Sequence, residues 1–284
     1  MLIVHTIAEL RDALADFDCP AFVPTMGNLH RGHLSLLEQA SALGDCTVAS
    51  IFVNRLQFLP HEDFDLYPRT WEADCKALRS VDCDVLFAPR EEDLYPEPQR
   101  FKVIADPSLA AKLEGVFRPG FFDGVCTVVM KLFIAVFAGK AQGVAVFGKK
   151  DYQQLKVIEA MTRQFAWPVQ ISAGETAREQ DGLALSSRNA YPTEAQRQQA
   201  SQLYQQLLAF AQLCKANPVL AADPAWCETE EKKSVSQLAE SGWSVDYFKL
   251  LRREDLDPAT PSDLKVVLAA ARLGQTRLID NLEL

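Results

Sequence analysis

Short apolar runs alternate with helical patterns over residues 1–172 of the chain. Strand character is found in five runs, at 20–23, 46–53, 83–88, 144–147 and 169–172. The β-branched run at 46–53 is typical of a strand buried on both faces. Helical patterns lie between the runs, beginning near 34 and covering 70–79, 126–138 and 152–165. This alternation predicts a mostly parallel sheet with helices on both faces, which we assign to a domain at residues 1–175.

The pattern changes character after about residue 190. Thr193-Glu194-Ala195-Gln196 has the form of a capping box, followed by a helix that carries Leu203, Leu207, Phe210 and Leu213 on one face. A charged helix ends near Gly242, and short strands are predicted at 245–251, 266–271 and 277–282. These elements predict a smaller α+β domain at residues 176–284, with the boundary between Gly174 and Tyr191.

Composition narrows the class of protein. The chain has 284 residues, 48% of them hydrophobic, and a formal charge of −9, which disfavours a nucleic-acid surface. We expect no signal peptide, and the apolar region at 125–138 is too short to span a bilayer. The seven cysteines contain no C-x-x-C pair, which predicts reduced thiols in a cytoplasm.

The segment 24–33, Pro-Thr-Met-Gly-Asn-Leu-His-Arg-Gly-His, joins the first predicted strand to a helix. A glycine-bearing turn at a helix start presents backbone N–H groups to phosphate. His30 and His33 flank Gly32, and a neutral imidazole can hydrogen-bond a phosphate. An H-x-x-H spacing can also arise by chance. A zinc site is disfavoured because no third ligand lies nearby.

Three further stretches carry candidate chemistry. Asn54 and Gln57 follow the second strand, and their amides suit a substrate that bears hydroxyls and a carboxylate. Lys150 follows the strand and glycine at 144–148, where it can neutralise phosphate. The run 186–188, Ser-Ser-Arg, forms a candidate phosphate clamp in a segment suited to a lid. A capped strand end, a solvated lysine pair and a polar surface turn are the corresponding structural alternatives.

Together these motifs resemble the pantothenate synthetase (pantoate–β-alanine ligase) family along nearly the whole chain. The matching pieces are P-T-M-G-N-L-H-R-G-H, F-V-N-R-L-Q-F, Y-P-R-T, R-P-G-F-F-D-G-V, F-G-K-K-D-Y-Q-Q-L and D-G-L-A-L-S-S-R-N. The resemblance implies an H-x-G-H nucleotidyltransferase with a Rossmann-like domain and a C-terminal lid. It also implies a homodimer that uses ATP and Mg²⁺ to join (R)-pantoate and β-alanine through a pantoyl adenylate in coenzyme A biosynthesis.

The resemblance also assigns roles to residues. His33, His30, Lys150 and Arg188 match catalytic positions, and Gln57 and Gln154 match pantoate-binding positions, to which we add Asn54. Asp74 lies near where a metal-associated aspartate of the family is expected, and no metal ligand is assigned. The positions expected to bind ATP are Met26, Gly27, Asn28, Leu29, His30, Arg31, Gly32, His33, Gly148, Lys149, Lys150, Asp151, Ala177, Leu185, Ser186, Ser187 and Arg188.

The sequence departs from the family pattern at three positions. Phe121 stands where the family usually has His, Asp123 where it has Arg, and Arg55 where it has Pro. These departures leave open a degenerate ATP-binding homologue with impaired turnover. Another nucleotidyltransferase with the same turn and a different acceptor is the second alternative. An aminoacyl-tRNA synthetase is disfavoured by the acidic charge.

Overall fold

The computed structural model describes residues 1–59, 62 and 64–284, and its internal contacts divide the chain into two compact units. Unit 1 comprises Met1–Lys149 and Gln154–Glu175, and unit 2 comprises Lys150–Gln153 and Thr176–Leu284. None of the helices among these residues is long and apolar enough to cross a membrane.

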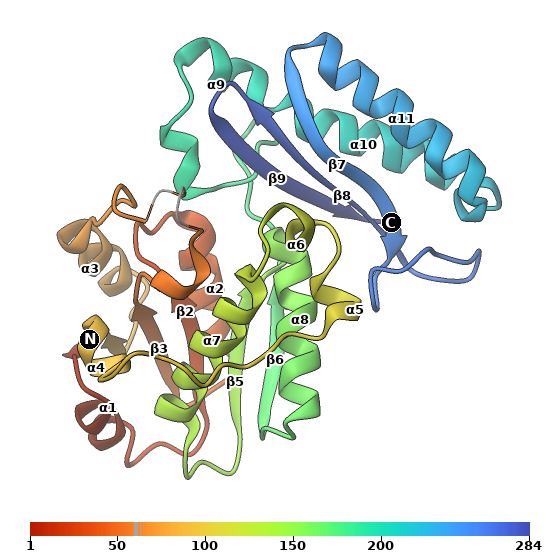
Figure 1. Ribbon diagram of the computed structural model, residues 1–284. Coiled ribbons are helices and arrows are strands. Elements are labelled where there is room, and N and C mark those ends of the chain that lie inside the picture. Colours follow the sequence, from red (N-terminus) through yellow and green to blue (C-terminus); the bar gives the residue numbers. More distant parts are fainter. Residues whose placement is uncertain (60–61, 63) are drawn as a thin grey trace. The chain divides into compact units, whose positions relative to one another are not determined.

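Unit 1 is built on a six-stranded sheet in which every pairing is parallel. The strand order is β1-β4-β3-β2-β5-β6, and Figure 1 labels β3, β2, β5 and β6 of this sheet. The strands are β1 (Leu2–Val4), β2 (Pro20–Thr25), β3 (Cys46–Ile51), β4 (Val85–Phe87), β5 (Gly143–Gly148) and β6 (Val169–Gly174). The predicted parallel α/β sheet is therefore confirmed, and β1 is an additional edge strand that the apolar pattern did not reveal.

Helices cover both faces of this sheet because successive strand side chains point to opposite sides. Phe22 packs in the core on one face, with helices α1 (Ile7–Ala13), α7 (Phe121–Phe137) and α8 (Tyr152–Gln164). Its neighbours Ala21 and Val23 pack in the core on the other face, with α2 (Arg31–Ser41) and α3 (Trp71–Arg79). The short elements of this part of the chain are η1 (Arg55–Gln57), α4 (Glu91–Leu94), α5 (Pro107–Ala110), α6 (Glu114–Phe117) and η2 (Lys149–Asp151).

Helix α7 begins at Phe121, five residues before the predicted start at Cys126, and is buried along most of its length. Gly120 precedes it with a φ of 80°, a conformation that favours glycine. A Cβ at Gly124 would lie 2.2 Å from the carbonyl oxygen of Leu56. Only a glycine therefore permits α7 to pack this closely against η1, which carries Gln57.

Unit 2 has an antiparallel three-stranded sheet in the order β7-β8-β9. Helices α10 and α11 pack on one face of this sheet (Figure 1). On that face Phe210 and Phe248 meet edge to face, with ring centroids 5.1 Å apart. The elements are η3 (Ser187–Ala190), α9 (Glu194–Ala200), α10 (Gln202–Ala216), η4 (Leu220–Ala222), α11 (Pro224–Glu240), β7 (Trp243–Arg252), β8 (Lys265–Leu273) and β9 (Thr276–Glu283). The predicted α+β architecture is confirmed.

The segment at the start of unit 2 is helical as predicted, but it forms two helices where one was expected. The capping box at Thr193 and Gln196 is present. The single helix expected there is divided into α9 and α10, which meet at Ser201. Leu203, Leu207 and Phe210 are buried as expected, whereas Leu213 is exposed.

Candidate functional site

The segments expected to form the site leave the sheet of unit 1 at neighbouring strands. β3, β2 and β5 are adjacent and parallel, so their carboxyl ends lie at the same edge. The chain leaves them after Ile51, Thr25 and Gly148. The strand order also reverses at β2 and β5, because β3 lies on one side of this pair and β6 on the other. Such a switch point is where α/β sheets bind ligands.

A buried carboxylate shapes the turn that follows β2. Asp74 in α3 is 2% exposed, and its oxygens accept the backbone N–H groups of Asn28 at 2.9 Å and Leu29 at 2.7 Å. Thr70 donates its hydroxyl to the same carboxylate at 3.1 Å. Gly27 and Asn28 have φ values of 83° and 51°, so the turn needs a glycine and an asparagine-like residue there.

These contacts show that Asp74 holds the backbone of the turn. They do not support a role for Asp74 as a metal ligand. Its oxygens accept hydrogen bonds from three groups of the chain. Among the residues described here, no group of three or more His, Cys, Asp or Glu side chains is arranged to hold a metal ion. The sequence carried a signal for the burial of Asp74, because it lies beside the apolar helix positions Cys75 and Leu78, and none for its partners in the turn.

The two histidines stand side by side at the start of α2, with ring centroids 4.1 Å apart. Nδ1 of His30 accepts the N–H of Gly32 at 3.1 Å, and Nδ1 of His33 accepts the N–H of His30 at 3.3 Å. A neutral imidazole that accepts at Nδ1 carries its proton on Nε2. Both rings are therefore held as Nε2–H donors at a helix N-terminus, an arrangement suited to phosphate oxygens.

Gln57 lies against the turn of the histidines. Its Nε2 is 3.2 Å from Sδ of Met26, and its Oε1 accepts a hydrogen bond from Nδ2 of Asn54 at 3.0 Å. Asn54 is 1% exposed and also accepts the hydroxyl of Tyr95 at 3.0 Å. Burial raises the pKa of Tyr95 further above its ordinary value, so this hydroxyl stays protonated and donates. Asn54 thus supports Gln57, whose side chain is the more accessible of the two amides.

The residues at the three unusual positions all have partners within unit 1. Phe121 lies under the guanidinium of Arg118, with Cζ 3.7 Å from the ring centroid, and Arg118 donates to the carbonyl of Gln57 at 3.2 Å. Oδ1 of Asp123 accepts the N–H of Ala105 at 2.9 Å. Arg55 has two exposed contacts, a stack on the ring of Phe64 and an ion pair with Glu91. The departures from the family pattern are thus accommodated by the packing of unit 1.

The segment after β5 contains both expected lysines. Lys149 in unit 1 forms an ion pair with Glu175 at 2.5 Å. Lys150 in unit 2 lies 3.8 Å from Asp151, and its side chain is largely buried. A loose pair leaves an ammonium better able to serve an anionic ligand than a tight pair does, which favours Lys150. Gly148 ends β5, and Gln154 lies in the first turn of α8.

The segment that contains Ala177 and the Ser-Ser-Arg run folds back on itself in unit 2. The N–H of Leu185 donates to the carbonyl of Ala177 at 2.9 Å. Oγ of Ser186 accepts the N–H of Arg188 at 3.2 Å and caps η3, which begins at Ser187. The structure thus assembles 26–33 with Gln57 in unit 1, and 177–188 in unit 2. That both groups grip one nucleotide stays a prediction.

Comparison with known proteins adds family information to this geometry. The sequence model of the family described as pantoate-beta-alanine ligase matches residues 2–283. The chain is 58% identical over 292 residues to a pantothenate synthetase of Verminephrobacter eiseniae and 60% identical over 286 residues to one of Paracidovorax citrulli. Each alignment covers 100% of both proteins.

Solved structures give the same result. A pantothenate synthetase from Thermus thermophilus is 41% identical, with a TM-score of 0.90, and the match covers 100% of this chain and 99% of that one. A pantoate-beta-alanine ligase from Francisella tularensis, crystallised with beta-gamma ATP and beta-alanine, is 30% identical, with a TM-score of 0.82. That match covers 100% of this chain and 97% of the other.

Proposed function

Because this chain belongs to the pantoate–β-alanine ligase family, we propose that it joins (R)-pantoate to β-alanine at the expense of ATP, forming pantothenate, AMP and pyrophosphate. The observation that carries the proposal is the pair of imidazoles at the start of α2, each fixed as an Nε2–H donor at the carboxyl edge of the sheet. This is the arrangement that a nucleotide phosphate needs.

The first step activates the acid. An amine does not attack a carboxylate usefully, so a carboxylate oxygen of pantoate attacks the α-phosphorus of ATP. The bond from that phosphorus to the bridging oxygen breaks, pyrophosphate leaves, and pantoyl adenylate remains. The nucleophile is already ionised at neutral pH and needs no general base. The histidines therefore act as hydrogen-bond donors to developing charge.

In the second step the amino group of β-alanine, in its neutral form, attacks the acyl carbon of the adenylate. The amide bond forms, the acyl–oxygen bond breaks, AMP leaves with that oxygen, and the nitrogen loses a proton. The protein must hold the amine beside the acyl carbon and keep water away from it. In this proposal the side chain of Gln57 lies near both pantoate and β-alanine, and Gln154 holds pantoate from α8.

Charge on the transferring phosphate requires donors that are in place before the reaction. In the proposal, the backbone of Met26–His33 covers the phosphates, and the backbone of Ala177 meets the adenine. The side-chain donors are His30, His33, Lys150, Ser186, Ser187 and Arg188. Removal of one such donor costs about 10²–10³ in rate in well-studied oxyanion sites.

The nucleotide substrate of the proposal is MgATP. Mg²⁺ usually keeps several waters and binds substrate phosphates, so it does not require a cluster of protein carboxylates. We also include a homodimer, which sedimentation at several concentrations would test, and a cytoplasmic location. All seven cysteines lie in the described part of the chain and are free thiols, which suits a reducing compartment. In the proposal, unit 2 acts as the lid of unit 1.

Pantoate-dependent exchange of radioactive pyrophosphate into ATP tests the proposal directly. Exchange reports reversible adenylation, so it should require pantoate and proceed without β-alanine. Adding β-alanine should then yield AMP and pantothenate in equal amounts. Exchange driven by a phosphorylated alcohol in place of pantoate, or ATP binding with no exchange, would contradict the proposal.

A further inference from the structure

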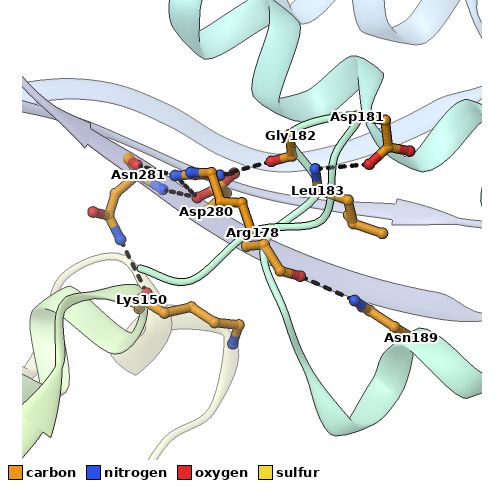
Figure 2. A network of polar contacts seen from close by, with 9 residues as sticks. Lys150, Arg178, Asp181, Gly182, Leu183, Asn189, Asp280 and Asn281 are labelled. Atoms are coloured by element: carbon orange, nitrogen blue, oxygen red, sulfur yellow. Dashed lines mark hydrogen bonds and ion pairs between the residues drawn. The ribbon is translucent and has the colours of Figure 1, made fainter. Parts of the chain in front are cut away.

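A buried ion pair in unit 2 is not used by the chemistry proposed above. Asp280 in β9 is 5% exposed and receives both terminal nitrogens of Arg178, at 2.7 and 2.9 Å (Figure 2). The N–H of Asn281 also donates to this carboxylate at 2.7 Å. Burial raises the pKa of Asp280, and the hydrogen bonds from Arg178 oppose that shift.

The guanidinium of Arg178 makes its hydrogen bonds to other groups of the same chain. Besides Asp280 it donates to the carbonyls of Gly182 at 3.0 Å and Asn281 at 3.1 Å. Its Cζ lies 4.0 Å from the ring centroid of Tyr204. With its terminal nitrogens engaged and one face stacked, Arg178 is placed to fix the backbone around it and is poorly placed to bind a phosphate itself.

The backbone that Arg178 fixes is the one expected to hold ATP. Arg178 follows Ala177 directly and forms an antiparallel bridge with Ala184, and the N–H of Glu179 donates to the carbonyl of Leu183 at 2.8 Å. Gly182 closes this turn with a φ of 93°, and a Cβ there would lie 2.2 Å from the ring of Tyr204. These backbone hydrogen bonds and the close packing on Tyr204 restrain the turn, and the Ser-Ser-Arg run leaves from its end.

Asn281, the residue after Asp280 in β9, holds the segment that contains Lys150, which is also expected to bind ATP. Asn281 donates from Nδ2 to the carbonyl of Lys150 at 3.0 Å (Figure 2). Successive strand residues point to opposite faces, so Asp280 and Asn281 reach different segments from adjacent positions. Two residues later, Glu283 accepts the hydroxyl of Tyr152 at 2.9 Å, which fixes the segment of Lys150 a second time.

We propose that Arg178, Asp280 and Asn281 are positioning residues that set the relative placement of the Ala177–Arg188 turn and Lys150 for ATP binding. A buried ion pair contributes little net stability compared with apolar packing. We therefore assign this pair the role of fixing the position of the backbone around it. This inference rests on the function proposed above, because it concerns the same nucleotide.

The test uses Arg178→Lys and Asn281→Ala in the full chain. Lysine keeps the charge but cannot donate two parallel hydrogen bonds. In pantoate-dependent pyrophosphate exchange, Arg178→Lys should raise the KM for ATP about tenfold or more, because a displacement of about 1 Å at a reacting group can cost 10²-fold. The KM for pantoate should stay unchanged. Asn281→Ala is the milder change and should lower kcat for exchange through Lys150.

Asp246→Asn is the matched control. Arg277 and Asp246 form another largely buried pair in the same unit, joined at 2.7 Å by Nε and Oδ2. Its loss should lower the Tm and leave the KM for ATP unchanged. An equal rise in the ATP KM in the control, or a lower Tm with unchanged kinetics in both test variants, overturns the inference. Absence of exchange in the unmodified enzyme would instead contradict the proposed function.

Discussion

Each imidazole of the pair His30 and His33 has two separate tasks. Nδ1 accepts a hydrogen bond from a backbone N–H group and so helps to cap α2. Nε2 carries a hydrogen and can donate a hydrogen bond to a phosphate oxygen. A histidine that caps a helix can be required for structural reasons alone. The two tasks must therefore be separated by substitutions that imitate one nitrogen at a time.

Asparagine and glutamine separate these tasks at His33. The oxygen of asparagine lies near the place of Nδ1, so His33→Asn keeps the acceptor and loses the donor. We expect pantoate-dependent exchange to fall by about 10²–10³ with little change in Tm. His33→Gln extends an amide toward the place of Nε2, and should retain more activity at a lower Tm. Losses of activity and Tm that run parallel in both variants would make His33 purely structural.

Phe121, where the resemblance led us to expect a histidine, packs against Arg118. Its ring is buried beneath the guanidinium, which in turn holds the carbonyl of Gln57. We expect Phe121→Ala to lower the free energy of unfolding by about 3 kcal/mol and to raise the KM for pantoate, because Arg118 loses its stacking partner.

Urea unfolding and exchange kinetics measure the two effects of Phe121→Ala. Phe121→His is the control, since it retains a flat ring and should change the pantoate KM much less. A normal pantoate KM in Phe121→Ala would show that the stack on Arg118 does not act on Gln57.

At the scale of the element, helix α3 shapes the turn that precedes helix α2. α3 delivers Asp74 to the loop between β2 and α2, where its carboxylate satisfies two backbone N–H groups that have no helical partner. The turn at residues 26–33, which is predicted to bind ATP, thus owes its shape to an acidic side chain 46 residues further along the chain. Substitution of that side chain should disturb nucleotide binding without any direct contact to the nucleotide.

We expect Asp74→Asn to raise the KM for ATP and to lower the free energy of unfolding by about 1–3 kcal/mol, because the new amide N–H₂ group faces donors. Exchange kinetics and urea unfolding measure the two effects. Asp45→Asn is a matched control, because Asp45 accepts the N–H groups of Asp18 and Cys19 just before β2, at the opposite end of the strand from the turn at residues 26–33. An unchanged ATP KM in Asp74→Asn would contradict the role given to Asp74.

The sequence pattern predicted elements well where many residues share one environment. The apolar runs that became β2, β3, β4 and β5 are buried in a sheet covered on both faces, so a continuous run of such residues is a strong signal. β1 has three residues and α1 has seven, too few to show a period. The break at Ser201 was missed because its neighbours on both sides favour helix.

The motifs of the candidate site can be recognised in the sequence, whereas the side chains that support those motifs cannot. The glycines and histidines of the turn predicted to bind ATP are a local pattern, visible within about ten residues of sequence. Asp74 and the pair Arg178–Asp280 act across 46 and 102 residues, and no period or motif indicates which distant residue a carboxylate will meet. Only the folded chain shows these partners, and both serve as scaffolds for predicted ligand-binding backbone.

At the scale of the whole molecule, buried thiols report on the opening of each unit. Burial raises the pKa of Cys126 in unit 1 and Cys214 in unit 2 to about 12. Both thiols are buried and almost entirely protonated at pH 8, so alkylation in the native state requires opening. Cys19 and Cys227 are partly exposed and should react first.

This difference tests whether one nucleotide is held by both units. Iodoacetamide labelling at about pH 8, followed by mass spectrometry of Cys126 and Cys214, measures the opening of each core separately. A ligand at about 100 times its Kd stabilises the state that binds it by about 2.7 kcal/mol, a hundredfold reduction in opening. If residues of both units grip the nucleotide, ATP with pantoate should slow labelling of both cysteines by similar factors. Protection of Cys126 with unchanged labelling of Cys214 would restrict the nucleotide site to unit 1, and would remove Lys150 and Arg188 from the proposed mechanism.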